Sequence, residues 1–385
     1  MRLLRAVGVF FKKADMLLLA LCLAASLFGV VILSSTTRYM GSGHYILTQL
    51  LAIGLGVALY IALTLFDVEI LVGQSVPLFA FNMLFISTLF IWGVAGNTGN
   101  RSWLAFSWLP FSIQPAEICK ITFILINAAI MRNRQRRISE PRTVMKLAAH
   151  LIITAGLIIL ASDDFGVALI YVFVFLLMAF TGGVSKYWFY SGLGLTAIAA
   201  PILWFGLFRE DQKNRIIALF DPSIDPTGSG VRWQTNLSLR AIRGGGITGQ
   251  GLYCGDLVQA GANPQQHNDF VFSSIAEELG IVGCVLTLLL LTAIIIRCLY
   301  VGAKSGSYLN RQICVGIAGM MIFQVAVNVG MCLGLFPVVG LTLPFISSGG
   351  SSLVSTFFAM GIVSGIRMHP SPDSAAAYVR PPNLT

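Results

Sequence analysis

Charged side chains are scarce in this sequence. Asp, Glu, Lys and Arg make up 11% of the 385 residues, whereas about 25% is usual for a soluble globular domain. The chain is 56% hydrophobic and has a mean hydropathy of +0.82. So few charges cannot cover the surface of a soluble protein of this length, which indicates a protein whose solvent is mostly lipid.

The sequence also lacks the patterns of a disulfide framework or a zinc site. Its seven cysteines are an odd number, and no CxxC or Cys/His ligand spacing is present. The run GGGITG at 244–249 matches GxGxxG, but no strand precedes it and no Rossmann unit surrounds it, which excludes a dinucleotide site. Two interpretations of this run remain: tight backbone turns, or an anion-binding nest of N–H groups.

Apolar stretches long enough to cross a bilayer recur along almost the whole chain. They predict an all-α polytopic membrane protein that forms one integral membrane domain over 1–385. We count ten stretches, at 16–34, 45–65, 76–95, 113–131, 146–161, 165–182, 188–208, 271–297, 312–335 and 345–366. The fifth and sixth are separated only by Ser162, Asp163 and Asp164, so one interrupted helix is an alternative there.

The net charge of +9 is explained by its distribution. With ten spans and a cytoplasmic N-terminus, 16 basic residues face the cytoplasm, and the short outer loops hold only Arg38 and Arg101. This asymmetry follows the positive-inside rule. The charge therefore indicates topology rather than nucleic-acid binding, and it places the C-terminal tail, 367–385, in the cytoplasm.

One long polar segment, 208–271, lies between the seventh and eighth spans on the outer side. Loops of this length are usually functional or disordered, and the apolar residues scattered through this one favour ordered structure. We expect the active surface here. Two shorter outer segments, 96–112 and 336–350, accompany it, and the Ser-Ser-Gly-Gly run that contains Ser347 and leads to Ser351 predicts a broken start to the last helix.

The strongest candidate for chemistry is HNDFVFSSIAEELG, 267–280. Asp269, two residues after His267, lies where the polar loop meets the eighth span, and desolvation there would raise its pKa toward that of a general base. Helix capping by Asp269 is the open alternative. Glu277 and Glu278 lie inside the span, where acids are functional or salt-bridged.

Two further sets of charges are candidates. Glu117 and Lys120 are three residues apart on one helical face inside the fourth span, either as a structural ion pair or as holders of a charged ligand. Basic residues of the long loop could bind a phosphate or pyrophosphate headgroup, or be solvated. These basic residues are Arg209, Lys213, Arg215, Arg232, Arg240 and Arg243.

Six segments in order resemble one family over nearly the whole chain. They are QPAEICK, SDDFG, FDP, the stretch 233–251, PQQHNDFVFSSIAEELG and GLTLPFISSGGSS. Together they resemble the SEDS family, which includes FtsW, RodA and SpoVE. The sequence departs from the family pattern at Ser162, Asn268 and Ser348, and the GLTLP run at 340–344 favours the division or sporulation branch over the elongation branch.

The resemblance implies a peptidoglycan glycosyltransferase that polymerises lipid II on the outer face of the bacterial cytoplasmic membrane, together with a class B penicillin-binding protein. It implies that Asp269 is the essential aspartate. We expect Lys213, Arg215, Arg240, Arg243 or a divalent cation to stabilise the pyrophosphate, and Gln234, Ser238 and His267 to bind substrate. We expect Glu117, Lys120, Asp164 and Glu278 to organise the helices below the cavity. No organic cofactor is expected.

Two other functions fit the same residues. A transporter or flippase of the lipid-linked precursor would use polar pairs within spans and a broken last helix, but it needs no base on the outer loop. A non-catalytic scaffold for a penicillin-binding protein would use the outer loop for contact alone.

Overall fold

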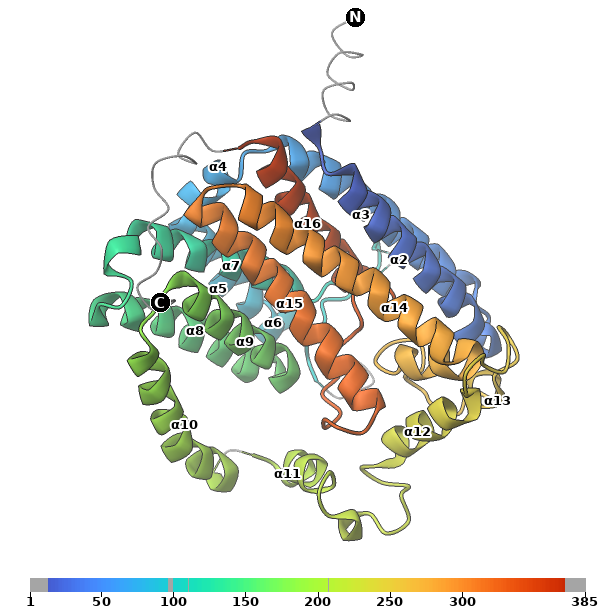
Figure 1. The fold of residues 1–385 in the computed structure, drawn as a ribbon. Helices are drawn as coiled ribbons and strands as arrows, with labels where there is room; N and C mark the ends of the chain where they lie inside the picture. The colour runs from blue at the N-terminus through green and yellow to red at the C-terminus, as the bar shows by residue number, and fades with distance from the viewer. Residues whose placement is uncertain (1–12, 96–99, 110, 207, 371–385) are drawn as a thin grey trace, which may run out of the picture.

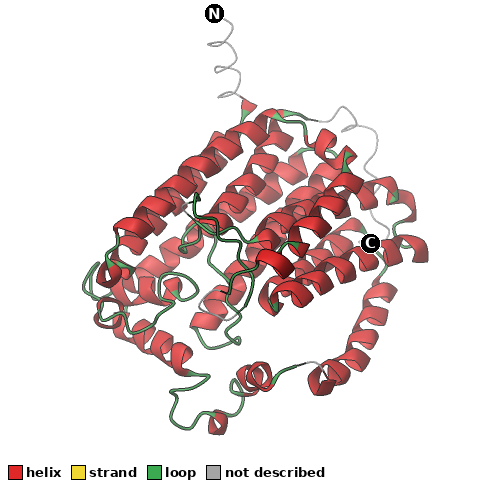
Figure 2. Cartoon of the chain, turned by 180° about the vertical axis from the view of Figure 1, so that it is seen from behind, coloured by secondary structure: helices red, strands yellow, loops and turns green. Residues whose placement is uncertain are grey.

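The computed structural model describes residues 13–95, 100–109, 111–206 and 208–370. Within these ranges the regular structure is helical, apart from two isolated antiparallel bridges that join Val94 to Trp103 and Leu104 to Ile113. Loops lie among the helices as well as at their ends (Figure 2). The prediction of an all-α protein is confirmed.

Long helices form the bundle seen in Figure 1. Nine helical segments of the described chain are long and apolar enough to span a membrane. The helix α7 has the length of a span but carries Glu117, Lys120 and Arg132 along its 19 residues. The bounds are α2 (Met16–Thr36), α3 (Gly43–Leu65), α5 (Ser75–Ser87) with α6 (Leu89–Trp92), α7 (Pro115–Asn133), α8 (Pro141–Ser162), α9 (Phe165–Gly182), α10 (Lys186–Gly206), α14 (Val271–Lys304), α15 (Tyr308–Cys332) and α16 (Gly350–Met368).

Each of the ten expected stretches coincides with one of these long helical segments, but several boundaries differ; α8, for example, begins at Pro141 instead of 146. The stretch around Asp163 forms two helices, because Asp163 adopts a left-handed conformation (φ 56°) and Asp164 caps α9. The helix α14 continues to Lys304 instead of 297. The helix α16 begins at Gly350 instead of 345, because the preceding segment is held in a turn in which the Leu343 N–H donates to Ser347 Oγ (2.8 Å).

Glycines allow α3 and α16 to pack closely. A Cβ added to Gly361 would lie 2.9 Å from the Tyr60 Cα atom, and one added to Gly56 would lie 2.5 Å from the Phe357 ring. Small residues permit such close backbone approach in membrane bundles, where packing rather than hydrophobic transfer drives helix association.

The helix α10 stands apart from the bundle (Figure 1). None of its most apolar 18-residue window is buried within the protein. Its N-terminal end is docked on the preceding corner, where the Trp188 Nε1–H donates to the carbonyl of Ser139 (2.9 Å). The rest of α10 is therefore available to lipid.

Short helices organise the long loop expected at 208–271. They are α11 (Glu210–Ile217), α12 (Trp233–Gly245) and α13 (Asp256–Gln259), with a 3-10 turn at Pro222–Ile224 between the first two. Figure 1 shows α12 and α13 against the lower end of α14 in that view, and this end is called the outer end below. The remaining short helix, α4 (Val68–Gly73), follows α3.

A buried ion cluster that the sequence analysis did not single out joins three helices at the opposite end. Asp15 is fully buried and accepts hydrogen bonds from Arg297 Nε (2.8 Å) and contacts Arg367 Nη1 (2.9 Å). These residues link the start of α2 to α14 and α16. The backbone carbonyl of Asp15 also accepts a hydrogen bond from the Tyr60 hydroxyl of α3 (2.7 Å).

Candidate active site

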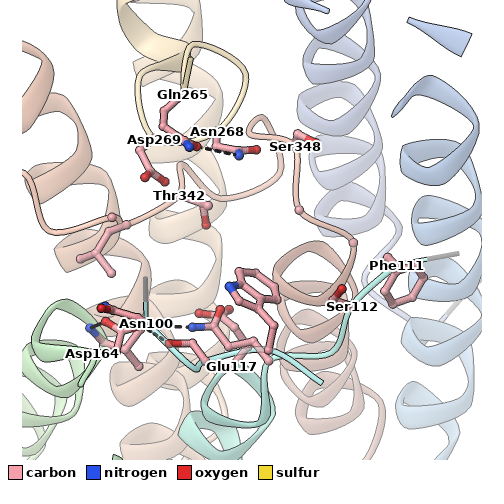
Figure 3. A pocket seen from close by; sticks show the side chains of 18 of the residues that line it. Asn100, Phe111, Ser112, Glu117, Asp164, Gln265, Asn268, Asp269, Thr342 and Ser348 are labelled. Carbon is pink, nitrogen blue, oxygen red and sulfur yellow. Dashed lines mark hydrogen bonds between the residues drawn. The ribbon is translucent and has the colours of Figure 1, made fainter. Parts of the chain in front are cut away.

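A polar cavity of about 460 Å³ opens at the outer end of the bundle (Figure 3). Its walls come from the start of α3, the segment before α7, the start of α9, the end of the long loop and the segment before α16. The polar lining residues are His44, Tyr45, Thr48, Asn100, Ser102, Ser112, Gln114, Glu117, Asp164, Arg215, Gln265, His267, Asn268, Asp269, Thr342 and Ser348.

Asp269 lines this cavity directly before α14 and is 8% exposed. Its backbone is held in place, because the Asn328 Nδ2 group of α15 donates to the carbonyl oxygens of Asp269 (2.9 Å) and Leu341 (2.7 Å). Among the described residues, none donates a hydrogen bond to its carboxylate. The carboxylate does not cap α14, whose first residue follows Phe270 without a side-chain cap. The capping alternative is therefore not what the structure shows.

The electrostatics of the cavity keep Asp269 near its titration point. Burial raises the pKa of Asp269 to about 7, and the negative charge of Asp164 adds to this effect. Burial likewise raises the pKa of Asp164 to about 6. The hydrogen bond from the Val167 N–H stabilises the charged carboxylate and lowers this pKa, but its effect is smaller than that of burial. In the view of Figure 3, Asp269 lies above Asp164 in the cavity wall. At neutral pH a substantial fraction of Asp269 is a carboxylate ready to accept a proton.

The deep wall of the cavity is built on a buried ion pair. Lys120 Nζ lies 2.7 Å from Glu117 Oε2, and both side chains are almost fully buried. The Ser355 hydroxyl of α16 donates to the same carboxylate (3.3 Å). Glu117 lines the cavity, whereas Lys120 does not. This geometry fits the ion-pair alternative, with the carboxylate of the pair facing the cavity.

Asp164 lies at the junction of three segments. Its carboxylate accepts hydrogen bonds from the Val167 N–H (3.0 Å), the Gln114 side chain (3.3 Å) and the Ser102 hydroxyl (3.4 Å). It thus ties α9 to the segment before α7, as expected for a residue that organises helices, and it also lines the cavity.

The rim brings His267 beside Asp269. The His267 ring packs edge-on against Tyr45, with ring centroids 5.3 Å apart, and its Nδ1 atom has no partner among the described residues. Burial lowers the pKa of His267, so the ring is neutral at pH 7. The hydroxyl of Ser347 donates to the Asn268 carbonyl (2.7 Å), which fixes the loop against the segment before α16.

Ser351 and Arg215 each make a hydrogen bond to a segment that surrounds the cavity. The Ser351 hydroxyl accepts a hydrogen bond from the Gln114 N–H (3.0 Å), which ties α16 to the segment before α7. Arg215 reaches the cavity from α11 and donates to the Val338 carbonyl (3.2 Å). Arg215 is the single basic residue of the expected phosphate-binding set that lines the cavity.

The other residues expected to bind substrate lie outside this cavity. Lys213 pairs with Glu210 (2.8 Å). Ser238 is buried and donates to the Cys332 carbonyl (2.8 Å), so it serves packing rather than sugar binding. The helix α12 turns Ser238, Ala241 and Gly245 inward, which leaves Arg240 and Arg243 exposed on its other face. Gln234, on the same helix, does not line the cavity either.

Glu277 and Glu278 secure the long loop and do not line the cavity. The Glu277 carboxylate accepts hydrogen bonds from the N–H groups of Leu257 (2.8 Å) and Val258 (3.0 Å) in α13. Glu278 accepts hydrogen bonds from the Ser35 hydroxyl (2.6 Å) and the Gln259 amide (2.9 Å). Both are structural anchors, and Glu278 joins α14 to α2 through Ser35.

The glycine-rich run joins the loop to a break in α14. At Gly280 (φ 66°) the helix is interrupted, and the loop supplies the missing partners. The N–H groups of Gln250 and Gly251 donate to the Glu277 and Glu278 carbonyls (2.9 Å each). In return, the N–H groups of residues 281 and 282 donate to the carbonyls of residues 246 and 247 (3.0 and 3.3 Å). We call this arrangement, residues 244–251 with 277–282, the glycine splice; it is neither a nucleotide site nor an isolated turn.

Several residues of the site escaped the sequence analysis. His44 and Tyr45 line the cavity but carry no charge and lie in none of the family-like segments. Gln265 and Thr342 lie in two of those segments, but they are uncharged and nothing in the segments marks them as site residues. Asn328 was detectable in principle, because an amide inside an apolar span needs a buried partner.

A metal site made of protein groups alone is not present in the described chain, where no three His, Cys, Asp or Glu side chains gather. Asp269 and Asp164 share the cavity, and one or two carboxylates with substrate phosphates are a usual Mg²⁺ environment. The divalent cation stays a prediction, and these two carboxylates are the groups that would hold it.

Comparison with known proteins identifies the relatives of this chain. The family model FTSW_RODA_SPOVE, described as "Cell cycle protein", matches residues 13–371. The chain is 32% identical over 366 residues to the probable peptidoglycan glycosyltransferase FtsW of Geobacter metallireducens, covering 92% of this chain and 95% of that protein. It is 34% identical over 275 residues to the peptidoglycan glycosyltransferase MrdB of Escherichia coli, covering 71% and 72%.

Solved structures show the same fold. One is a chain of a peptidoglycan synthase complex, studied for the structural coordination of polymerization and crosslinking, with a TM-score of 0.77 and 30% identity over 92% of this chain and 97% of that one. An aspartate-to-alanine mutant of the rod shape determining protein RodA from Thermus thermophilus has a TM-score of 0.68 and 28% identity, with coverage of 92% and 97%.

Proposed function

The chain belongs to the FtsW/RodA/SpoVE family and is a peptidoglycan glycosyltransferase of the cytoplasmic membrane; we propose that it polymerises lipid II in the cavity around Asp269, on the outer face. The observation that carries this proposal is the carboxylate of Asp269. It is buried, has no hydrogen-bond donor among the described residues, and faces a polar cavity large enough for sugar rings.

Asp269 acts as the general base. It removes the proton from the 4-hydroxyl of the acceptor N-acetylglucosamine as that oxygen attacks the anomeric carbon of the growing chain's terminal N-acetylmuramic acid. The new glycosidic bond forms with inversion, and undecaprenyl pyrophosphate leaves with the electron pair of the broken bond. The raised pKa of Asp269 suits it to this proton transfer near neutral pH.

The leaving pyrophosphate needs positive charge. Arg215 lines the cavity and is held there by its bond to the Val338 carbonyl, so it is the side chain we assign to this task. A guanidinium binds phosphate oxygens in a bidentate manner and stabilises the charge that develops on departure. A divalent cation on Asp269 and Asp164 would supply further charge; no step above depends on it.

A penicillin-binding protein of class B is the partner we propose. The solved relative that coordinates polymerization with crosslinking is part of a synthase complex, and a polymerase that makes glycan strands requires a transpeptidase to join them.

The two alternatives have less support. A flippase needs a polar path across the bilayer, but the deep end of this cavity meets the buried pair of Glu117 and Lys120. A scaffold has no use for a buried carboxylate without hydrogen-bond donors.

The proposal is tested with purified protein, its penicillin-binding partner and labelled lipid II in detergent. We expect the wild type to make glycan strands and Asp269→Asn to make none, because the amide cannot accept the proton. Asp256→Asn is the matched control, since Asp256 is an exposed acid of the same loop. Full polymerisation by Asp269→Asn would show that Asp269 is not the general base. If the wild type makes no polymer with any metal or partner tried, the flippase or the scaffold would be favoured.

A further inference from the structure

A turn rich in arginine lies between α7 and α8, at the end of α7 that is remote from the cavity. The 19 residues of α7 extend about 28 Å at 1.5 Å per residue, close to the thickness of about 30 Å of a hydrocarbon core. Its first turn faces the cavity through Glu117. The residues that follow its last turn therefore lie at the opposite membrane interface.

This turn borders an open hollow of about 460 Å³ lined by Arg132, Asn133, Arg134, Gln135, Arg136 and Arg137. Arg137 pairs with Glu140 at 3.6 Å. In the part of the chain that the structure describes, the side chains of Arg132, Arg134 and Arg136 have neither a carboxylate nor a hydrogen-bond acceptor. The positive-inside rule explains why arginines are on this side, but it does not explain why three of them line one hollow without counterions among the described residues.

The neighbouring corner has the features of a membrane interface. The Ser139 hydroxyl accepts a hydrogen bond from the Ser185 N–H (2.9 Å), which places the start of α10 beside the turn. Here the Lys186 amine lies 5.9 Å from the ring centroid of Tyr187, a side chain that is 70% exposed. Farther along, α10 exposes apolar side chains, and Leu193 is also 70% exposed.

We propose that this corner, residues 132–137 with the start of α10, binds the phosphate group of an anionic phospholipid of the inner leaflet. Guanidinium groups bind phosphate oxygens in a bidentate manner. A basic pocket on the cytoplasmic side of a membrane helix is a usual headgroup site. A lipid is favoured over a soluble anion because exposed apolar and aromatic surface continues from the hollow along α10, where acyl chains can lie.

The test measures lipid retention by the full-length protein. The detergent-purified chain is mixed with phosphatidylglycerol and phosphatidylcholine, and bound lipids are counted by native mass spectrometry. We compare Arg134→Gln/Arg136→Gln with Lys13→Gln/Lys304→Gln, a pair that removes the same charge elsewhere on the cytoplasmic side. Arg134→Lys/Arg136→Lys keeps the charge at the hollow and checks that the turn tolerates substitution.

We expect the wild type to prefer phosphatidylglycerol, and the glutamine pair at the hollow to weaken its binding by about 30-fold, since each basic residue near an anionic surface contributes about fivefold. The control pair and the lysine pair should retain the preference. Equal loss in the control pair, or no loss in either pair, would overturn the proposal. So would complete displacement of the lipid by inorganic phosphate, which would assign the hollow to a soluble anion.

Discussion

Two adjacent glycines allow the glycine splice to be tested with the same substitution. A Cβ added to Gly245 would lie 1.8 Å from the carbonyl oxygen of Ala276, a backbone atom that cannot move without displacing α14. A Cβ added to Gly244 would meet only the end of the Gln250 side chain, at 3.2 Å. Gly245→Ala should therefore separate α12 from α14, whereas Gly244→Ala should not.

The loss of stability expected for Gly245→Ala follows from the backbone hydrogen bonds of the glycine splice. Four backbone hydrogen bonds join residues 246–251 to residues 277–282, and each contributes about 0.5–1.5 kcal/mol, so Gly245→Ala should lower the free energy of unfolding by about 2–6 kcal/mol. Gly244→Ala should be neutral or stabilise α12 by up to about 1 kcal/mol, since alanine favours helix over glycine.

Asp269 lies just before the part of α14 that the splice holds, so the same variant should also slow polymerisation of lipid II. We would measure unfolding in detergent, hydrogen exchange of the amides of residues 250, 251, 281 and 282, and the polymerisation rate. Faster exchange at these four amides is expected for Gly245→Ala alone. If Gly245→Ala behaves like Gly244→Ala in all three measurements, the splice does not support α14 and the reasoning is wrong.

Three further predictions concern the cavity. The polymerisation rate should rise with pH through about 7, because the carboxylate of Asp269, and not the neutral acid, accepts the proton; a rate that falls over this range would contradict its role as base. Arg215→Gln should lower turnover about 100- to 1,000-fold, whereas Lys213→Gln, whose lysine is paired outside the cavity, should have little effect in the same assay. Glu117→Gln leaves the Lys120 ammonium buried without its counterion and should cost about 3–5 kcal/mol in chemical unfolding; a cost below about 1 kcal/mol is what a solvated pair would give.

The sequence predicted the membrane helices because an apolar run of sufficient length has few alternatives to spanning lipid. It identified Asp269 because an acid at the junction of a polar loop and a span is unusual. It could not show that the carboxylate lacks a capping role, since that depends on the geometry of a single turn of α14.

The long loop was the part that sequence patterns predicted least well. The sequence of an amphipathic helix such as α12 shows that one face is buried, but not against which helix it packs. The packing partner determines that Ser238 is buried and that Arg240 is exposed. The GGGITG run was harder still, because Gly245 and Gly249 are required by backbone atoms of Ala276 and Glu278 in α14, far along the chain. The cluster around Asp15 brings together residues from the two ends of the sequence, which only the packed bundle reveals.

The isolated position of α10 has a mechanical consequence. The 21 residues of α10 extend about 31 Å. Its start is fixed at Ser139, and the helix beyond its end is fixed where Arg209 pairs with Asp163 (2.7 Å). A helix that exposes most of its length to lipid adjusts to a thinner or thicker bilayer by tilting, and α11, which carries Arg215, follows it in the chain. The thickness of the surrounding membrane should therefore change the load on the Arg209–Asp163 pair that anchors α11, the helix whose Arg215 lines the described cavity, so the choice of lipid is a variable to control when the active site is assayed.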